Sequence, residues 1–280
     1  MVIDAENVIK ELVAKGIRLP PQPGVLLELQ KKLASDDYSM SDLSHIISSD
    51  PGITAMLFKA ARSPVFSSGK KFNSIEQVLM VIGLQQTYNL IQAISLSTNL
   101  TDATRKVFDI FWTRSHEVAQ IASLIALDRV SVCNIFPDQA YMAGIFYDCG
   151  VPILMQRFPD YCSKLNVDSS ACWPVLAEED ALFNVDHCTI GYLVALHWKL
   201  PDFICKAIMS RQEIPHEELG AVRSLVAILQ LAVHLYCRIT RTEHPFWQKI
   251  RKDVLMELGI HLDTEQEYYE EITEQFLAGA

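Results

Sequence analysis

Apolar residues recur at helical spacing through most of the chain, and the first clear case follows Asp50-Pro51. An aspartate before a proline favours a helix start, because the carboxylate can accept hydrogen bonds from free backbone N–H groups and proline tolerates the first helical position. The apolar positions that follow lie on one helix face: Ile53, Met56, Leu57 and Ala60. The pattern predicts a short amphipathic helix that begins at Pro51.

A second stripe of this kind follows Asn73 and Glu76, which have the spacing of a helix capping box. Its apolar positions are Ile75, Val78, Leu79 and Ile82. Gly83 interrupts the stripe, so we expect two helices to meet there. Further helices are predicted from residue 108 onward and over residues 140–146.

The fold class follows from what the pattern contains and lacks. No strand-like alternation persists beyond a few residues, and there is no glycine-rich phosphate loop, so an all-α, multi-helical bundle is predicted. A length of 280 residues with 50% hydrophobic and 21% charged residues is typical of a compact globular protein. The best candidate breaks are residues 70–72 and 99–106, and we place a subdomain boundary near residue 105.

Charge and composition exclude several classes of partner. The formal net charge of −10 would repel a phosphate backbone, so nucleic-acid binding is not expected. Residues 1–18 lack the basic start and apolar stretch of a signal peptide. The longest apolar window, residues 225–237, contains Gln230 and His234 and predicts a buried core helix instead of a membrane span. Seven cysteines without a C-x-x-C pair favour a reducing cytoplasm.

A set of motifs, in this order along the chain, resembles the HDOD domain, a bacterial relative of the HD-superfamily phosphohydrolases. The motifs are LPPQP at 19–23, SDPGIT at 49–54, AARS at 60–63, SIEQ at 74–77, IGL at 82–84, FW at 111–112, SH at 115–116, AGIFYDCG at 143–150, His187 with Gly191, and WKLP at 198–201. The resemblance covers about residues 19–215 and implies an all-helical, non-catalytic regulatory domain. Arg62 departs from the family pattern, in which a small polar residue is usual.

The resemblance also suggests how the chain is divided. We expect an N-terminal helical subdomain over residues 1–105 and a degenerate HD-like helical subdomain over residues 106–215. A C-terminal helical extension would comprise residues 216–280. We expect Tyr147-Asp148 to lie on a helix buried at the centre, next to the helix that carries His116, because apolar residues flank the pair.

Compared with the HD superfamily, three metal-ligand positions are kept and four are lost. His116, Asp148 and His187 match the pattern. The lost positions carry Tyr147, Arg211, Gln212 and Val233. Because Arg211 adds positive charge and Val233 offers no lone pair, a two-metal centre cannot be assembled. The resemblance therefore implies a vestigial pocket, and we expect no cofactor.

Two readings of the retained ligands remain open. His116, Asp148 and His187 could hold a single divalent metal weakly, since three protein ligands and a water suffice for zinc. The preferred alternative is a buried hydrogen-bonded pair between Asp148 and His116, because a buried carboxylate needs a partner.

A basic cluster around the loop of residues 63–69 is a second candidate site. It comprises Lys59, Arg62, Lys70 and Lys71, which could bind a phosphate or nucleotide or could simply form a solvated face.

The favoured function is a signal-transduction module that does not catalyse a reaction and that binds a partner protein or a small ligand. The alternative is a metal-dependent phosphohydrolase with a reduced ligand set, acting on a nucleotide or cyclic dinucleotide. A purely structural helical subunit is the third possibility, and the acidic helix predicted near residues 265–276 would suit it.

Overall fold

The chain folds into helices joined by short connections, as the apolar spacing predicts. The structure is a computed structural model and describes residues 24–35, 37–62, 72–94, 102–167, 173–198, 200–210, 213–244 and 246–279. These residues contain α-helices, one short 3-10 helix at Glu217–Leu219, and no strand. The all-α prediction is therefore confirmed.

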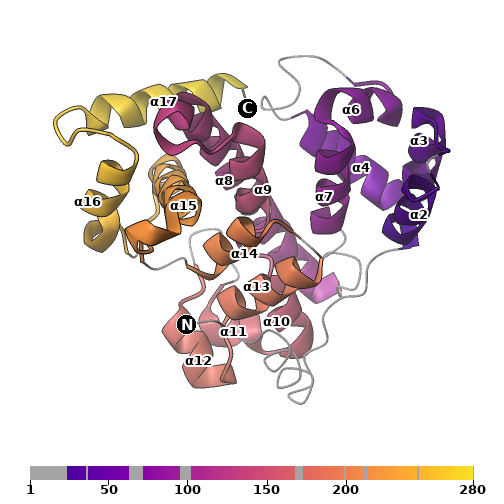
Figure 1. The fold of residues 1–280 in the computed structure, drawn as a ribbon. Helices are drawn as coiled ribbons and strands as arrows, with labels where there is room; N and C mark the ends of the chain where they lie inside the picture. The colour runs from indigo at the N-terminus through magenta and orange to yellow at the C-terminus, as the bar shows by residue number, and fades with distance from the viewer. Residues whose placement is uncertain are drawn as a thin grey trace.

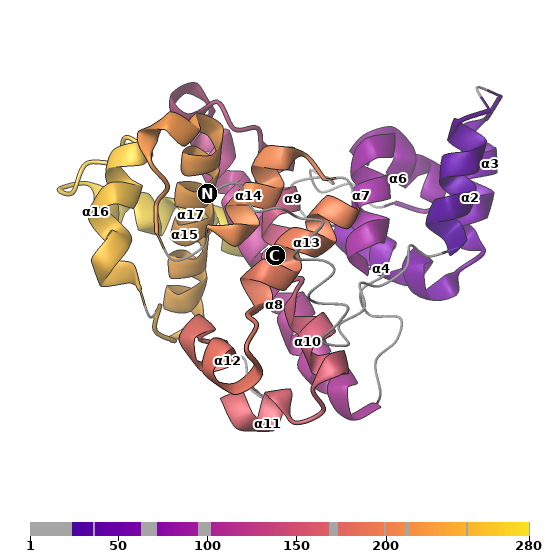
Figure 2. The same ribbon diagram turned by 60° about the horizontal axis from the view of Figure 1, so that its bottom comes forward.

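The N-terminal helices form a group of their own on the right of Figures 1 and 2. They are α2 (Gly24–Leu33), α3 (Met40–Ser48), α4 (Pro51–Ala61), α6 (Ile75–Ile82) and α7 (Leu84–Ile94). The predicted start of α4 is confirmed, because the Asp50 carboxylate accepts a hydrogen bond from the Ile53 backbone N–H at 3.0 Å. Gly83 has a φ of 86°, a left-handed value that suits glycine, and it separates α6 from α7 as predicted.

The predicted capping box at the start of α6 is shifted by one residue. Ser74 is the N-cap and its hydroxyl accepts from the Gln77 backbone N–H at 3.2 Å. The Gln77 side-chain oxygen in turn accepts from the Asn73 backbone N–H at 2.8 Å. The pair Asn73 and Glu76 was the wrong choice, because a serine cap with glutamine at the third helical position satisfies the same backbone groups.

The remaining helices begin with one long helix, α8 (Asp102–Cys133), which has 32 residues. They are α9 (Pro137–Ile145), α10 (Val151–Arg157), α11 (Tyr161–Leu165), α12 (Leu176–Phe183), α13 (His187–His197), α14 (Asp202–Met209), α15 (Gly220–Thr240), α16 (Trp247–Glu257) and α17 (Glu265–Gly279). Helices α9 and α15 both pack against α8. This packing brings His116 on α8, the turn that follows α9 and Val233 on α15 to one core.

The Tyr147-Asp148 segment is buried, but it is not helical. Helix α9 ends at Ile145, and residues 146–150 form turns before α10 begins at Val151. The expectation of a helix through Tyr147 and Asp148 is therefore wrong. Their burial is as expected, since the exposed fractions are 4% for Tyr147 and 3% for Asp148.

The predicted core helix at residues 225–237 is the middle of α15. The segment Glu217–Thr240 is the one stretch within the described part of the chain that is long and apolar enough to cross a membrane. Of its apolar window, 78% is buried inside the protein. The burial supports the interpretation of α15 as a core helix.

Close contact between α8 and α9 depends on a glycine, and we predict that even one added methyl group disturbs it. A Cβ at Gly144 would lie 2.5 Å from the Ala119 Cα, which is backbone and cannot rotate away. Gly144→Ala should lower the free energy of unfolding by about 1–3 kcal/mol in chemical denaturation. The control is Gly24→Ala, because a Cβ at Gly24 meets nothing within 4 Å. Equal stability of the two variants would contradict the prediction.

Candidate functional site

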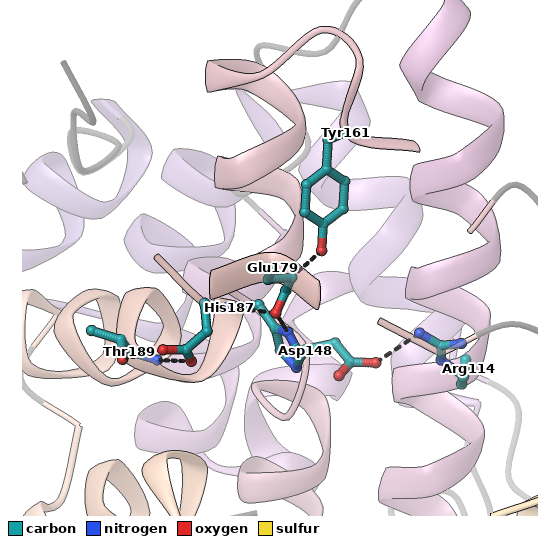
Figure 3. A network of polar contacts seen from close by, with 7 residues as sticks. Arg114, Asp148, Tyr161, Glu179, His187 and Thr189 are labelled. Carbon is teal, nitrogen blue, oxygen red and sulfur yellow. Dashed lines mark hydrogen bonds and ion pairs between the residues drawn. The ribbon is translucent and has the colours of Figure 1, made fainter. Parts of the chain in front are cut away.

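Asp148 forms a buried ion pair with Arg114 of α8. The Arg114 Nη2 lies 3.0 Å from the Asp148 Oδ2, and the two side chains are 1% and 2% exposed (Figure 3). The Arg114 guanidinium also lies 3.9 Å from the centre of the Trp173 ring and 4.4 Å from that of Phe111. The predicted pair of Asp148 with His116 is therefore wrong. Arginine satisfies the carboxylate better, because it supplies a full positive charge as well as hydrogen bonds.

His116 has a different partner. Its Nδ1 and the Tyr141 hydroxyl are 3.0 Å apart and share a hydrogen bond. Burial, with a smaller contribution from the charge of Lys59, lowers the pKa of His116 from 6.5 to about 4. Burial also raises the pKa of Tyr141. Both groups are therefore uncharged near neutral pH.

His187 belongs to a second buried network, centred on Glu179. Glu179 accepts hydrogen bonds from the Tyr161 hydroxyl and from the His187 backbone N–H, and its carboxylate also contacts the His187 Nδ1 (Figure 3). Its exposed fraction is 0% and that of His187 is 2%. His187 is held at the first position of α13, where the preceding Asp186 caps the helix by accepting from the Thr189 N–H at 2.8 Å.

The turn of residues 146–150 brings the two networks together by lying directly on α13. A Cβ at Gly150 would fall 2.0 Å from the His187 carbonyl oxygen, so only glycine fits at that position. The Cys149 thiol contacts the Gly191 carbonyl oxygen at 3.6 Å. Burial, then the charge of Glu179 and, less strongly, that of Asp148 raise the pKa of Tyr161. The Tyr161 hydroxyl therefore lies within the field of both carboxylates and keeps its proton.

The other predicted site residues are placed only in part. Tyr147 and Val233 are both buried. Arg211 and Gln212 lie outside the described residues, as do Lys70 and Lys71 of the basic cluster. Lys59 and Arg62 are exposed near the end of α4, and the charge of Lys59 acts on His116 and Glu117. Anion binding by this cluster stays a prediction.

The side chains present do not fit a divalent metal. Asp148 is bound to the Arg114 guanidinium, whereas the ring contacts of His187 with Glu179 and of His116 with Tyr141 use Nδ1 only and do not involve Nε2. In the described parts of the chain, no group of three or more His, Cys, Asp or Glu side chains is arranged to hold a metal ion. The positive charge of Arg114 would also repel a cation bound beside Asp148. The vestigial-pocket interpretation stays a prediction.

Sequence reasoning missed the two residues on which these networks depend, Arg114 and Glu179. Arg114 shares a helix face with Phe111 and Val118, which are both buried. A charge within an apolar stripe predicts a buried ion pair, because an unpaired charge is too costly there. Glu179 gave a weaker signal, since it stands between two other acidic residues in the chain.

The fold defines a class: an all-helical protein whose central polar side chains, Arg114, Asp148, Glu179 and His187, are buried and bonded to one another in pairs. The HDOD domain profile matches residues 19–214, which is most of the chain. The chain therefore belongs to the HDOD family.

Known proteins that resemble the chain are distant in sequence. An uncharacterized protein of Treponema pallidum (strain Nichols) is 24% identical over 220 residues, which is 77% of this chain and 42% of that protein. The chain thus spans less than half of that relative's length. An HDOD domain protein of unknown function from Geobacter sulfurreducens has a solved structure that is 24% identical, with a TM-score of 0.57 and coverage of 96% of each chain.

A second solved structure is closer in shape and lower in identity. It is a candidate metal-dependent phosphohydrolase from Shewanella amazonensis SB2B, 18% identical, with a TM-score of 0.65 and coverage of 98% of this chain and 97% of that one. At these identities the likeness establishes the fold alone.

We predict that Arg114 and Asp148 act as one unit in stability. Arg114→Met should lower the free energy of unfolding by about 3–5 kcal/mol, because it leaves the Asp148 carboxylate buried without its cation. The double variant Arg114→Met, Asp148→Leu should cost less than the sum of the single variants in urea titrations. Strict additivity would show that the pair is not coupled.

A surface ion pair provides the matched control for this cycle. Lys164 and Asp160 are 2.7 Å apart and about half exposed, so Lys164→Met should leave the urea midpoint unchanged.

The lowered pKa of His116 predicts a loss of stability in acid. The unfolded chain binds a proton at His116 below pH 6.5, whereas the folded protein resists it until about pH 4, so stability falls as the pH drops through this window. His116→Gln should flatten the fall of the thermal midpoint between pH 6.5 and 4. The exposed His261→Gln serves as the control and should retain the wild-type slope. A His116→Gln profile parallel to wild type would refute this assignment.

Proposed function

We propose that the protein is a non-catalytic regulatory module that acts by binding a partner protein or a small ligand. The observation that supports the proposal is the buried ion pair between Arg114 and Asp148. A guanidinium carries only N–H donors, so it can neutralise the carboxylate but cannot bind and acidify a water as a metal does. The positive charge of Arg114 therefore stabilises the fold by neutralising Asp148.

The burial of the site adds a second argument. Tyr147, Asp148, His187 and Val233 are each 2–4% exposed. A phosphoester would have to reach the carboxylate through packed side chains, whereas hydrolysis requires an open position for water and substrate. Any binding by this module is therefore expected on its outer surfaces or at seams between its helices.

The alternative is a metal-dependent phosphohydrolase that uses His116, Asp148 and His187 on a nucleotide or cyclic dinucleotide. The name of one solved relative, a candidate metal-dependent phosphohydrolase, agrees with this alternative. The name of another, a candidate signal transduction protein from Marinobacter aquaeolei VT8, agrees with the regulatory role. The partner that Asp148 already has in Arg114 favours the regulatory role over the hydrolase.

We predict that the purified protein hydrolyses neither cyclic dinucleotides nor nitrophenyl phosphoesters above a buffer blank, with or without added Mn²⁺ or Fe²⁺. The reason is that Asp148 is paired with Arg114 and that both side chains are buried. Metal content after mild chelation should be far below one ion per chain. The control is Asp148→Ala measured in parallel, because activity or bound metal that disappears in this variant must originate at the site and would overturn the proposal.

A further inference from the structure

A groove of about 480 Å³ lies where α2 and α7 meet Trp198, the residue that follows α13. This volume is in the range of pockets that bind small molecules. Helices α2 and α7 belong to the N-terminal group, whereas α13 belongs to the helices that begin with α8, and Figure 2 shows one end of α13 near α7. The groove therefore lies at the seam between the two groups of helices.

The lining of the groove contains no formal charge among the described residues. It consists of two leucines, the aromatic side chains of Tyr88 and Trp198, and the amides of Gln30, Gln85 and Asn89. In a chain with a net charge of −10, a neutral groove of this size is a distinct environment. A phosphate or carboxylate would find no charged partner among these side chains, so the groove suits an uncharged ligand.

The hydrogen-bonding groups of the groove are partly arranged in advance. The Gln85 Nε2 donates to the Asn89 Oδ1 at 3.0 Å, which leaves the Asn89 amide nitrogen as a donor and the Gln85 oxygen as an acceptor. Trp198 is 2% exposed and its indole N–H has no hydrogen-bond partner. Because this N–H is covered by protein atoms, Trp198 borders the groove as an aromatic wall and not as a donor.

The ring of Tyr88 supplies a flat surface beside these groups. Its hydroxyl accepts a hydrogen bond from the Gln30 Nε2, and this contact from α2 fixes the half-buried ring on α7. Flat aromatic surfaces stack on heterocyclic rings, and paired amide groups read the donor and acceptor edges of such rings. We propose that the groove binds an uncharged heterocycle of the purine or pyrimidine class, stacked on Tyr88 and held at its edge by Gln85 and Asn89.

A ligand in this groove would join the two groups of helices. Polar contacts across the seam include the Gln92 Nε2 with the Trp198 carbonyl oxygen at 2.9 Å and the Gln86 Nε2 with the Asp138 Oδ2 at 2.6 Å. A heterocycle that touches both α7 and Trp198 would add to these contacts and favour one relative arrangement. The inference rests on the proposed function, because that function includes the binding of a small ligand.

The test is calorimetric titration of the full chain with adenosine, guanosine, cytidine and uridine, and with their 5′-monophosphates. At least one nucleoside should bind, and its monophosphate should bind no more tightly. Gln85→Ala, at an exposed position that tolerates change, should weaken binding about fivefold or more by removing one acceptor. Trp198→Phe, which replaces the indole with a smaller ring in the wall of the groove, should also weaken it.

The matched control is Gln275→Ala, an exposed glutamine on α17 outside the groove, which should bind as wild type does. The absence of binding by all four nucleosides at millimolar concentration would overturn the inference, and so would binding that depends on the phosphate. Binding that is unchanged in both Gln85→Ala and Trp198→Phe would place the ligand elsewhere and equally overturn it. None of these results bears on the hydrolysis and metal measurements, which test the proposed function separately.

Discussion

The centre of this protein is organised around a buried ion pair between Arg114 and Asp148. The Arg114 guanidinium lies between two aromatic rings and the Asp148 carboxylate, in a position from which water is almost fully excluded. Such a pair is held by its surroundings, since desolvation of the two charges offsets much of their attraction. The stacked rings and the closing turn of residues 146–150 are thus needed to keep the pair together. Once they do so, the Asp148 Oδ2 is paired with a fixed positive charge inside the protein.

Local features of the fold could be predicted from the sequence because their causes are local. Asp50 caps a helix three residues away, and Gly83 ends a helix through its own φ. The shifted cap at Ser74 shows the limit, because adjacent polar residues offer nearly equivalent hydrogen bonds and the packing of α6 selects between them. The end of α9 before Tyr147 was missed for a similar reason, since an apolar run suits a buried turn as well as a helix.

The candidate site could be predicted in location but not in connectivity. The positions of Asp148 and His187 were recognisable from their motifs, whereas their partners depend on contacts far apart in the chain. Arg114 and Asp148 are 34 residues apart, and any hydrogen-bond donor that the fold brought near could have satisfied the Asp148 carboxylate. Asp148 pairs with Arg114, whereas His116 shares a hydrogen bond with Tyr141 across the interface of α8 and α9. Only the tertiary packing contains that information.

The contact between Gly150 and the carbonyl oxygen of His187 has a consequence for how such chains diverge. Backbone touches backbone there, so no substitution with a side chain is sterically free, whatever the protein does. A relative that keeps this packing is therefore expected to keep glycine at positions 144 and 150, whatever side chains surround Asp148.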